Sequence, residues 1–206
     1  MDESRRKKEG MITTHPMRIP GVWRQGYVLD YHTIRSEFLG HDEFGNPIFD
    51  TKRTEVGELL YQLKYRRKLE ALDALVKTAT KFVKSWRVTF DVVVPVPPTK
   101  VRRFQPVFEI AARLANSLGL PFRQDFVRNV KNTKELKNVF DYNERITLLE
   151  NAYRVRDQSL RGKTVLLFDD LYRSGATLNA VTRILYEQAR CVDVCALALT
   201  RTRTAS

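Results

Sequence analysis

The sequence predicts an α/β fold in which a mostly parallel central sheet is flanked by helices. Three apolar runs rich in β-branched residues, at 92–96, 164–168 and 192–199, have the composition of strands that are covered on both faces. Amphipathic segments separate these runs, and such alternation of strand and helix is typical of a parallel sheet. With 206 residues, the chain is long enough to build one well-buried core.

The N-terminal quarter has a different character. Residues 1–20 are expected to form a flexible basic leader, and residues 21–55 a hairpin-like N-terminal addition, or hood. Within the hood, residues 27–34 are aromatic and β-branched, and residues 42–47 are turn formers. The remaining residues, 56–206, are expected to form the α/β domain.

Four segments are predicted to be helices because their apolar residues recur with a period near 3.6 or because they follow a strand and a turn. The last of them covers about 176–189, and the third ends at Gly119 and Pro121. The apolar positions that mark the first three are Leu59, Leu60 and Leu63; Leu72, Leu75, Val76, Ala79 and Val83; and Val107, Ile110, Ala111, Leu114, Ala115 and Leu118.

The formal net charge of +12 suits a polyanionic ligand, which could be a phosphorylated sugar, a nucleotide or nucleic acid. Charge alone does not choose among these three. No apolar run approaches the roughly 20 residues that span a bilayer, and the N-terminus lacks the apolar region of a secretory signal, so a cytoplasmic location is expected. Cys191 and Cys195 lie in an apolar stretch and are interpreted as small core residues of a reducing compartment.

The residues with the clearest chemistry follow the second strand. Ligands of open parallel sheets bind beyond the carboxyl ends of the strands, and there Asp169 and Asp170 precede the small residues Ser174 and Gly175. A helix N-terminus attracts a phosphate, and two carboxylates accept hydrogen bonds from vicinal hydroxyls. The loop therefore predicts a site for a ribose and its 5′-phosphate. The alternative is that an acid merely caps the helix while Gly175 shapes the turn. No P-loop or dinucleotide-binding motif is present.

Segment 165–177 resembles the phosphoribosyl pyrophosphate (PRPP) signature of the type I phosphoribosyltransferases. Over about 57–200 the chain is similar to the ComF (competence protein F) group of that superfamily, although it lacks the four-cysteine zinc module with which many of those proteins begin. Arg173 stands where the signature usually has a small or hydroxyl residue. The other matching elements are Leu63-Lys64-Tyr65; Val94-Pro95-Val96-Pro97 with Arg103-Phe104-Gln105; and Asn143-Glu144-Arg145 with Asn151-Ala152-Tyr153.

The resemblance implies the type I phosphoribosyltransferase fold and a set of site residues. It assigns the catalytic role, and the ribose hydroxyls, to Asp169 and Asp170. Mg²⁺ would bridge ligand oxygens and water, with either acid as a candidate protein ligand. The remaining residues that it implies are Arg173, Ser174, Gly175, Ala176 and Thr177 around the 5′-phosphate; Pro98, Thr99, Lys100 and Arg102 in the pyrophosphate loop; and Lys134, Lys137 and Arg145 in a mobile lid.

Several of these residues have a simpler interpretation. The basic loop at 100–103 is equally explained as solvated surface charge. The lysines at 131, 134 and 137, and Lys64, are more often surface charge than catalytic. His32 is interpreted as a strand residue with a hydrogen bond, and Tyr172 either stacks on a ligand or packs.

The expected function is transfer of ribose 5-phosphate from PRPP to an amine or nitrogenous base, with Mg²⁺ as cofactor and pyrophosphate as the second product. The expected partners are PRPP and a small-molecule acceptor, and a homodimer is possible. The alternatives are a non-catalytic PRPP or nucleotide sensor and a protein associated with DNA uptake. Nucleic acid is not favoured, because the basic residues are dispersed and no known DNA-binding motif is present.

Overall fold

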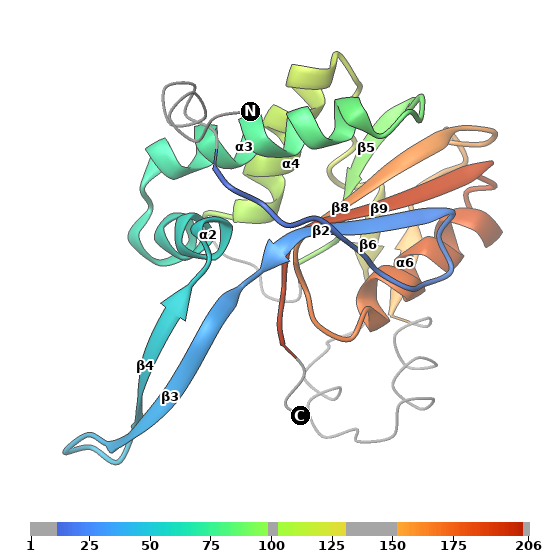
Figure 1. Cartoon of the computed structure of the whole chain (residues 1–206). Helices are drawn as coiled ribbons and strands as arrows, with labels where there is room; N and C mark the ends of the chain where they lie inside the picture. The colour runs from blue at the N-terminus through green and yellow to red at the C-terminus, as the bar shows by residue number, and fades with distance from the viewer. Residues whose placement is uncertain (1–11, 99–102, 131–151, 204–206) are drawn as a thin grey trace.

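The core of the molecule is a five-stranded sheet (Figure 1). The computed structural model describes residues 12–98, 103–130 and 152–203. The strands lie in the order β1-β2-β9-β8-β5, and only β1 runs antiparallel to its neighbour. Their bounds are β1 Met17–Arg18, β2 Gln25–Tyr31, β9 Asp193–Arg201, β8 Thr164–Tyr172 and β5 Val92–Pro95.

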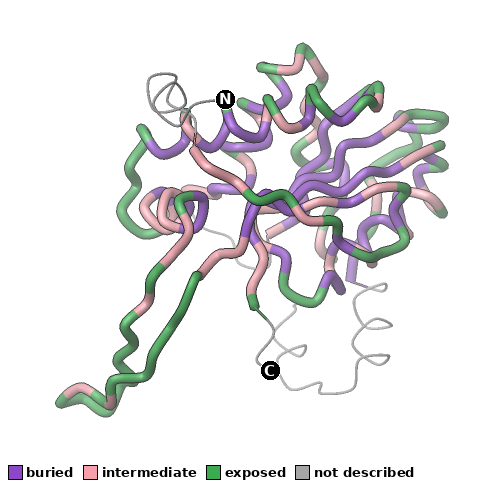
Figure 2. Tube along the Cα trace, in the orientation of Figure 1, coloured by how far each residue is buried: buried purple, intermediate pink, exposed green. Residues whose placement is uncertain are grey.

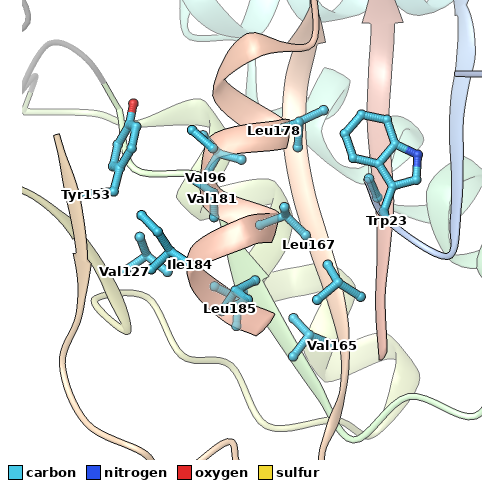
Figure 3. Close-up of a cluster of buried hydrophobic side chains, with 14 of the residues drawn as sticks. Trp23, Val96, Val127, Tyr153, Val165, Leu167, Leu178, Val181, Ile184 and Leu185 are labelled. Carbon is cyan, nitrogen blue, oxygen red and sulfur yellow. The ribbon is translucent and has the colours of Figure 1, made fainter. Parts of the chain in front are cut away.

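Helices cover both faces of this sheet. Helices α2 (Glu55–Arg66), α3 (Leu69–Ser85) and α4 (Pro106–Leu118) pack on one face, and α6 (Ala176–Glu187) packs on the other (Figures 1 and 3). The side chains of β8 alternate between the two cores, since Leu167 belongs to the α6 side and Phe168 to the α2–α4 side. The predicted α/β fold with a mostly parallel sheet between helices is therefore confirmed.

The helix ends follow the signals in the sequence. Pro106 begins α4, and Gly119 ends it in the left-handed conformation, with φ 68°. Thr54 caps α2, because its Oγ1 accepts a hydrogen bond from the Gly57 N–H at 3.1 Å. The two cysteines are buried and free, as expected for core residues, and burial raises the pKa of both thiols to about 11.

The N-terminal hairpin is present, but it begins later than predicted. Residues 27–34 were expected to form one of its strands, whereas the chain breaks at His32. Residues 25–31 form β2, which pairs in parallel with β9 inside the central sheet. The hairpin consists of β3 (Thr33–His41) and β4 (Pro47–Arg53). The physical reason is burial: Val28 and Leu29 are both fully buried, as a strand covered on two faces requires.

Part of the segment expected to be a leader is ordered. The buried Ile19 follows β1 and accepts a hydrogen bond from the indole of Trp23 at 3.2 Å. A short ribbon of β6 (Val127–Asn129) and β7 (Tyr153–Val155) flanks α6. No helix among the described residues is long and apolar enough to cross a membrane.

Candidate functional site

The carboxyl ends of three parallel strands lie level with one another. The register pairs Arg201 of β9 with Tyr172 of β8 on one side and with Tyr31 of β2 on the other. On the far side of β8, the Val96 N–H donates to the Phe168 carbonyl at 2.8 Å, so the chain leaving β5 passes beside the acidic pair. Residues from distant parts of the sequence therefore meet at this edge of the sheet.

An open pocket occupies the β8–α6 junction. Gly175 is the N-cap of α6 and contributes no capping side chain, and the first turn of α6 holds no acidic residue. Among the residues that the structure describes, no acidic side chain in the first turn and no capping side chain at Gly175 balances the partial positive charge of this helix end. The residues that line the pocket are Asp169, Leu171, Tyr172, Arg173, Ser174, Gly175, Ala176, Thr177 and Leu178.

Gly175 is required by the shape of this turn. Its φ is 77°, a conformation that costs a residue with a side chain, and a Cβ there would meet the Tyr172 hydroxyl at 2.8 Å. Tyr172 itself is buried, and the Arg201 guanidinium lies 5.7 Å from its ring centroid. Its ring therefore packs beneath the loop, which favours the packing interpretation over stacking on a ligand.

The two acids have different surroundings because neighbouring side chains of a strand point to opposite faces. Asp169 follows Leu167 on the α6 face and lines the pocket, whereas Asp170 follows Phe168 on the face that α2 covers. Desolvation, followed by repulsion from Asp170, raises the pKa of Asp169 to about 7. Its Oδ1 accepts the Asp170 N–H at 2.7 Å.

Asp170 forms an ion pair with α2. Lys64 Nζ lies 2.9 Å from Asp170 Oδ1, and the two side chains are only 17% and 15% exposed. Helix α2 comes this close because Gly57 has no side chain: a Cβ there would lie 2.0 Å from the His32 carbonyl oxygen. The interpretation of Lys64 as plain surface charge is therefore wrong.

His32 joins the end of β2 to the same group. Its Nδ1 lies 3.2 Å from the Thr200 hydroxyl, and that hydroxyl donates to the Asp170 carbonyl at 3.3 Å. Burial lowers the pKa of His32, and the charges of Lys64 and Arg53 lower it further. The expected hydrogen bond of His32 is thus present, and the imidazole is kept neutral beside a cationic cluster.

The alternative in which an acid caps α6 is not supported. The N-cap is Gly175, and Asp169 and Asp170 instead engage the Asp170 N–H and Lys64. Arg173 and Ser174 are exposed on the loop, and the half-buried Pro98 follows β5. The rest of the predicted pyrophosphate loop and lid, namely Thr99, Lys100, Arg102, Lys134, Lys137 and Arg145, lies outside the described residues.

Sequence reasoning missed two arginines at this edge of the sheet, one at the end of β9 and one whose charge acts on His32. Arg53 and Arg201 each have a buried Nε without a hydrogen-bond partner in the described part of the chain. Arg53 stacks on Tyr61, with its guanidinium carbon 3.9 Å from the ring centroid. No local motif marks these residues, because only the fold brings the ends of β4 and β9 to this edge of the sheet.

Within the described ranges, no group of three or more histidine, cysteine, aspartate or glutamate side chains forms a metal site. Asp169 and Asp170 nevertheless fit a hard divalent cation that takes most of its oxygen ligands from a bound phosphorylated sugar and water. Burial and the nearby charge of Asp170 raise the pKa of Asp169, and a bound cation would offset the repulsion between the two carboxylates.

The fold and this loop define an α/β protein with a candidate site for a phosphorylated sugar. No protein-family model matches the chain. The chain is related to the competence protein ComFC of Bacillus subtilis (strain 168), with 31% identity over 147 residues. This stretch covers 70% of the chain but only 59% of ComFC. The relationship confirms the predicted resemblance to the ComF group.

Solved structures of phosphoribosyltransferases resemble the chain at lower similarity. Adenine phosphoribosyltransferase from Saccharomyces cerevisiae shares 14% identity over 80% of this chain and 83% of that protein, with a TM-score of 0.46. The glutamine PRPP amidotransferase of B. subtilis, solved with ADP and GMP, shares 14% identity over 84% of this chain and 36% of that protein, with a TM-score of 0.48. At these scores the likeness supports no inference about function.

Proposed function

We propose that the chain binds Mg²⁺-complexed PRPP at the β8–α6 loop and transfers its ribose 5-phosphate group to an amine or nitrogenous base. The single observation that carries this proposal is the junction itself. Two adjacent carboxylates lie near the end of β8, and α6 begins six residues after the second of them with no acidic side chain in its first turn. Asp169 and the first residues of α6 line the same pocket. The carboxylates would accept hydrogen bonds from two hydroxyls of a sugar, and the N–H groups at the start of α6 would donate to a phosphate on the same sugar.

The roles of the residues follow from their surroundings. Asp170 forms an ion pair with Lys64 and accepts one ribose hydroxyl, while Asp169 accepts the other. The backbone N–H groups of residues 174–177 receive the 5′-phosphate, with the hydroxyls of Ser174 and Thr177 as further donors. Arg173 is exposed at the rim of the same loop and adds charge to the phosphate cradle.

Mg²⁺, when bound with the substrate, neutralises charge on the departing pyrophosphate. The bond between ribose C1 and the pyrophosphate oxygen breaks, with its electron pair leaving on pyrophosphate. A nitrogen lone pair of the acceptor then forms the new bond to C1, and the acceptor loses its proton to solvent. Asp169 and Asp170 fix the ribose ring during this exchange, so catalysis rests on orientation rather than on a protein nucleophile.

Calorimetry with PRPP and Mg²⁺ tests the binding step. We expect heat of binding with the natural chain and an affinity at least about tenfold weaker in the Asp169→Asn/Asp170→Asn variant, a change of about 1.4 kcal/mol or more. The matched control is Asp50→Asn/Asp73→Asn, which removes two exposed carboxylates outside the pocket. Absence of heat with the natural chain, or equal affinity in the site variant, would refute the proposal.

A measurement of pyrophosphate release distinguishes a phosphoribosyltransferase from a protein that only senses PRPP. Both bind PRPP, because the β8–α6 loop alone supplies the ribose and phosphate contacts. Release of pyrophosphate with one member of a panel of bases and amines identifies a transferase, whereas binding without release across the panel identifies a sensor. Salt-dependent retention of DNA on a gel, with no PRPP binding, would favour the nucleic-acid alternative.

A further inference from the structure

The β3–β4 hairpin, residues 33–53, projects from the body of the molecule and is called the arm here (Figures 1 and 2). Most of its length is exposed, including large apolar side chains. Their exposed fractions are Ile34 44%, Phe38 55%, Leu39 64%, Phe44 80%, Ile48 43% and Phe49 53%. An isolated two-stranded ribbon is marginal in water, so an arm of this composition calls for a partner that covers it.

The arm is amphipathic across its two faces. Phe38 and Phe49 are directly opposite each other, with ring centroids 5.5 Å apart, and the His41 ring lies 5.1 Å from Phe38. The other face is charged, since Arg35 reaches Glu37 at 3.4 Å and Asp50 at 3.5 Å. One aromatic face is therefore free for contact, with ionised groups around it.

The acidic residues of the arm gather in its outer part, whereas its three basic residues, Arg35, Lys52 and Arg53, lie near its base. Between residues 36 and 51 there are four acidic residues and no lysine or arginine, in a protein whose net charge is +12. Two of the acids, Asp42 and Glu43, lie at the tip. The negative outer part of the arm repels phosphates, so nucleic acid is a poor occupant of it and a basic surface is a good one.

Such a surface exists where α2 joins α3. Residues 65–69, called the corner here, contain the exposed apolar side chains Tyr65 (65%) and Leu69 (55%). Between them lie Arg66, Arg67 and Lys68, which are exposed and form no ion pair among the described residues. Arg67 adopts a left-handed conformation with φ 52°, which ends α2 and turns the chain sharply at this point.

We propose that the arm of one copy docks on the corner of a second copy, and that the reciprocal contact closes a two-fold dimer. Phe38 and Phe49 would cover Tyr65 and Leu69, and the acids of the arm would neutralise the three cations of the corner. Within one chain both surfaces are exposed, so the contact is between molecules. Reciprocal use of two different patches is the geometry of an isologous pair.

The molar mass in solution tests the proposal, measured by sedimentation or by light scattering after gel filtration. We expect a dimer at micromolar concentration that dissociates as salt is raised, because exposed charge pairs are screened. The Phe38→Thr/Phe49→Thr variant, which keeps β-forming residues in the arm, is expected to be a folded monomer. A natural chain that is monomeric at low salt would overturn the proposal, whatever else the arm binds.

Charge reversal distinguishes this dimer from any other. Glu37→Lys/Glu43→Lys reverses the arm, and Arg66→Glu/Lys68→Glu reverses the corner. Each variant alone is expected to dimerise at least about tenfold more weakly, because like charges meet at both contacts. Mixed together they restore a dimer, since every arm then faces a corner of opposite charge.

The matched control is Lys77→Glu/Lys84→Glu, which makes the same charge change on exposed positions of α3 and is expected to leave the dimer intact. Circular dichroism establishes that each variant is folded. A dimer that survives both the arm and the corner reversals uses another surface, and failure of the mixture to restore the dimer excludes the arm-to-corner contact. Either result overturns the proposal, independently of whether the chain binds PRPP.

Discussion

The two acids near the end of β8 have different neighbours because adjacent side chains of a strand point to opposite faces of the sheet. Asp169 lies towards the pocket, and Asp170 lies towards α2, where Lys64 holds it at 2.9 Å. Lys64 offsets the cost of burying the Asp170 carboxylate, whereas burial and the nearby Asp170 raise the pKa of Asp169 to about 7. The pair thus presents one acceptor that an ion pair holds in place and one that lines the pocket with a raised pKa.

This difference predicts a pH dependence of stability. The pKa of Asp169 rises from 3.8 to about 7 on folding, so the folded chain holds the proton that the unfolded chain loses. The free energy of unfolding should therefore fall as the pH rises from about 4 to about 7. Asp169→Asn removes this effect and should stabilise the chain at about pH 8 but hardly at about pH 4.

Thermal unfolding at the two pH values measures the effect, with a rise in Tm of roughly 2–4 °C for each kcal/mol gained. Asp50→Asn, at an exposed position of the arm, is the control and should change Tm little at either pH. An Asp169→Asn variant that is less stable than the natural chain at about pH 8 would contradict this view of the buried pair.

At the scale of elements, the sequence predicts three of the five strands of the central sheet. The apolar runs at 92–96, 164–168 and 192–199 correspond to β5, β8 and β9, since only strands buried on two faces are so uniformly apolar. The hairpin boundary was misplaced because residues 27–34 have the same β-forming composition on both sides of His32. Composition does not say which strand a segment will pair with.

Helix α2 is the element whose role in the site was not predicted. Its Lys64 follows an apolar stripe and looks like any exposed lysine, and only the close approach permitted by Gly57 brings it to Asp170. The Pro98–Arg102 and 131–145 segments were predicted from resemblance, and most of them lie outside the described residues, so their roles stay predictions.

The Lys64–Asp170 pair predicts a measurable coupling between α2 and β8. Lys64→Met keeps the aliphatic chain but leaves a partly buried carboxylate unpaired, and should lower the free energy of unfolding by about 1–3 kcal/mol. Lys77→Met, an exposed change on α3, should stay within about 0.5 kcal/mol of the natural chain. Chemical denaturation provides the measurement.

The double variant Lys64→Met/Asp170→Asn completes the cycle. Because it removes both charges, it should recover part of the stability that Lys64→Met alone loses. Strictly additive losses would mean that the two side chains do not interact, and would remove α2 from the site.

At the scale of the whole molecule, the site is assembled from segments far apart in the sequence. His32, Lys64, Asp170 and Thr200 meet because three parallel strands end at the same level. The arm begins at this same edge, directly after His32, yet it projects away from α6 (Figure 1). The body holds the candidate ligand site, and the arm carries the surface proposed for a second copy.

This division predicts that the rest of the chain still folds and binds its ligand when the arm is removed. Thr33 and Arg53 are paired across the base of the hairpin, so a two-residue Asn-Gly turn can replace residues 34–52 while keeping both. Retention of Arg53 preserves its contact with Tyr61 beside the site. Because nearly all of the replaced side chains are exposed, we expect a Tm within a few degrees of that of the natural chain, unchanged calorimetric binding of PRPP with Mg²⁺, and a monomeric mass. Loss of ligand binding in a variant that still folds would show that the arm also contributes to the pocket, and a dimeric mass would show that the two copies associate through the body.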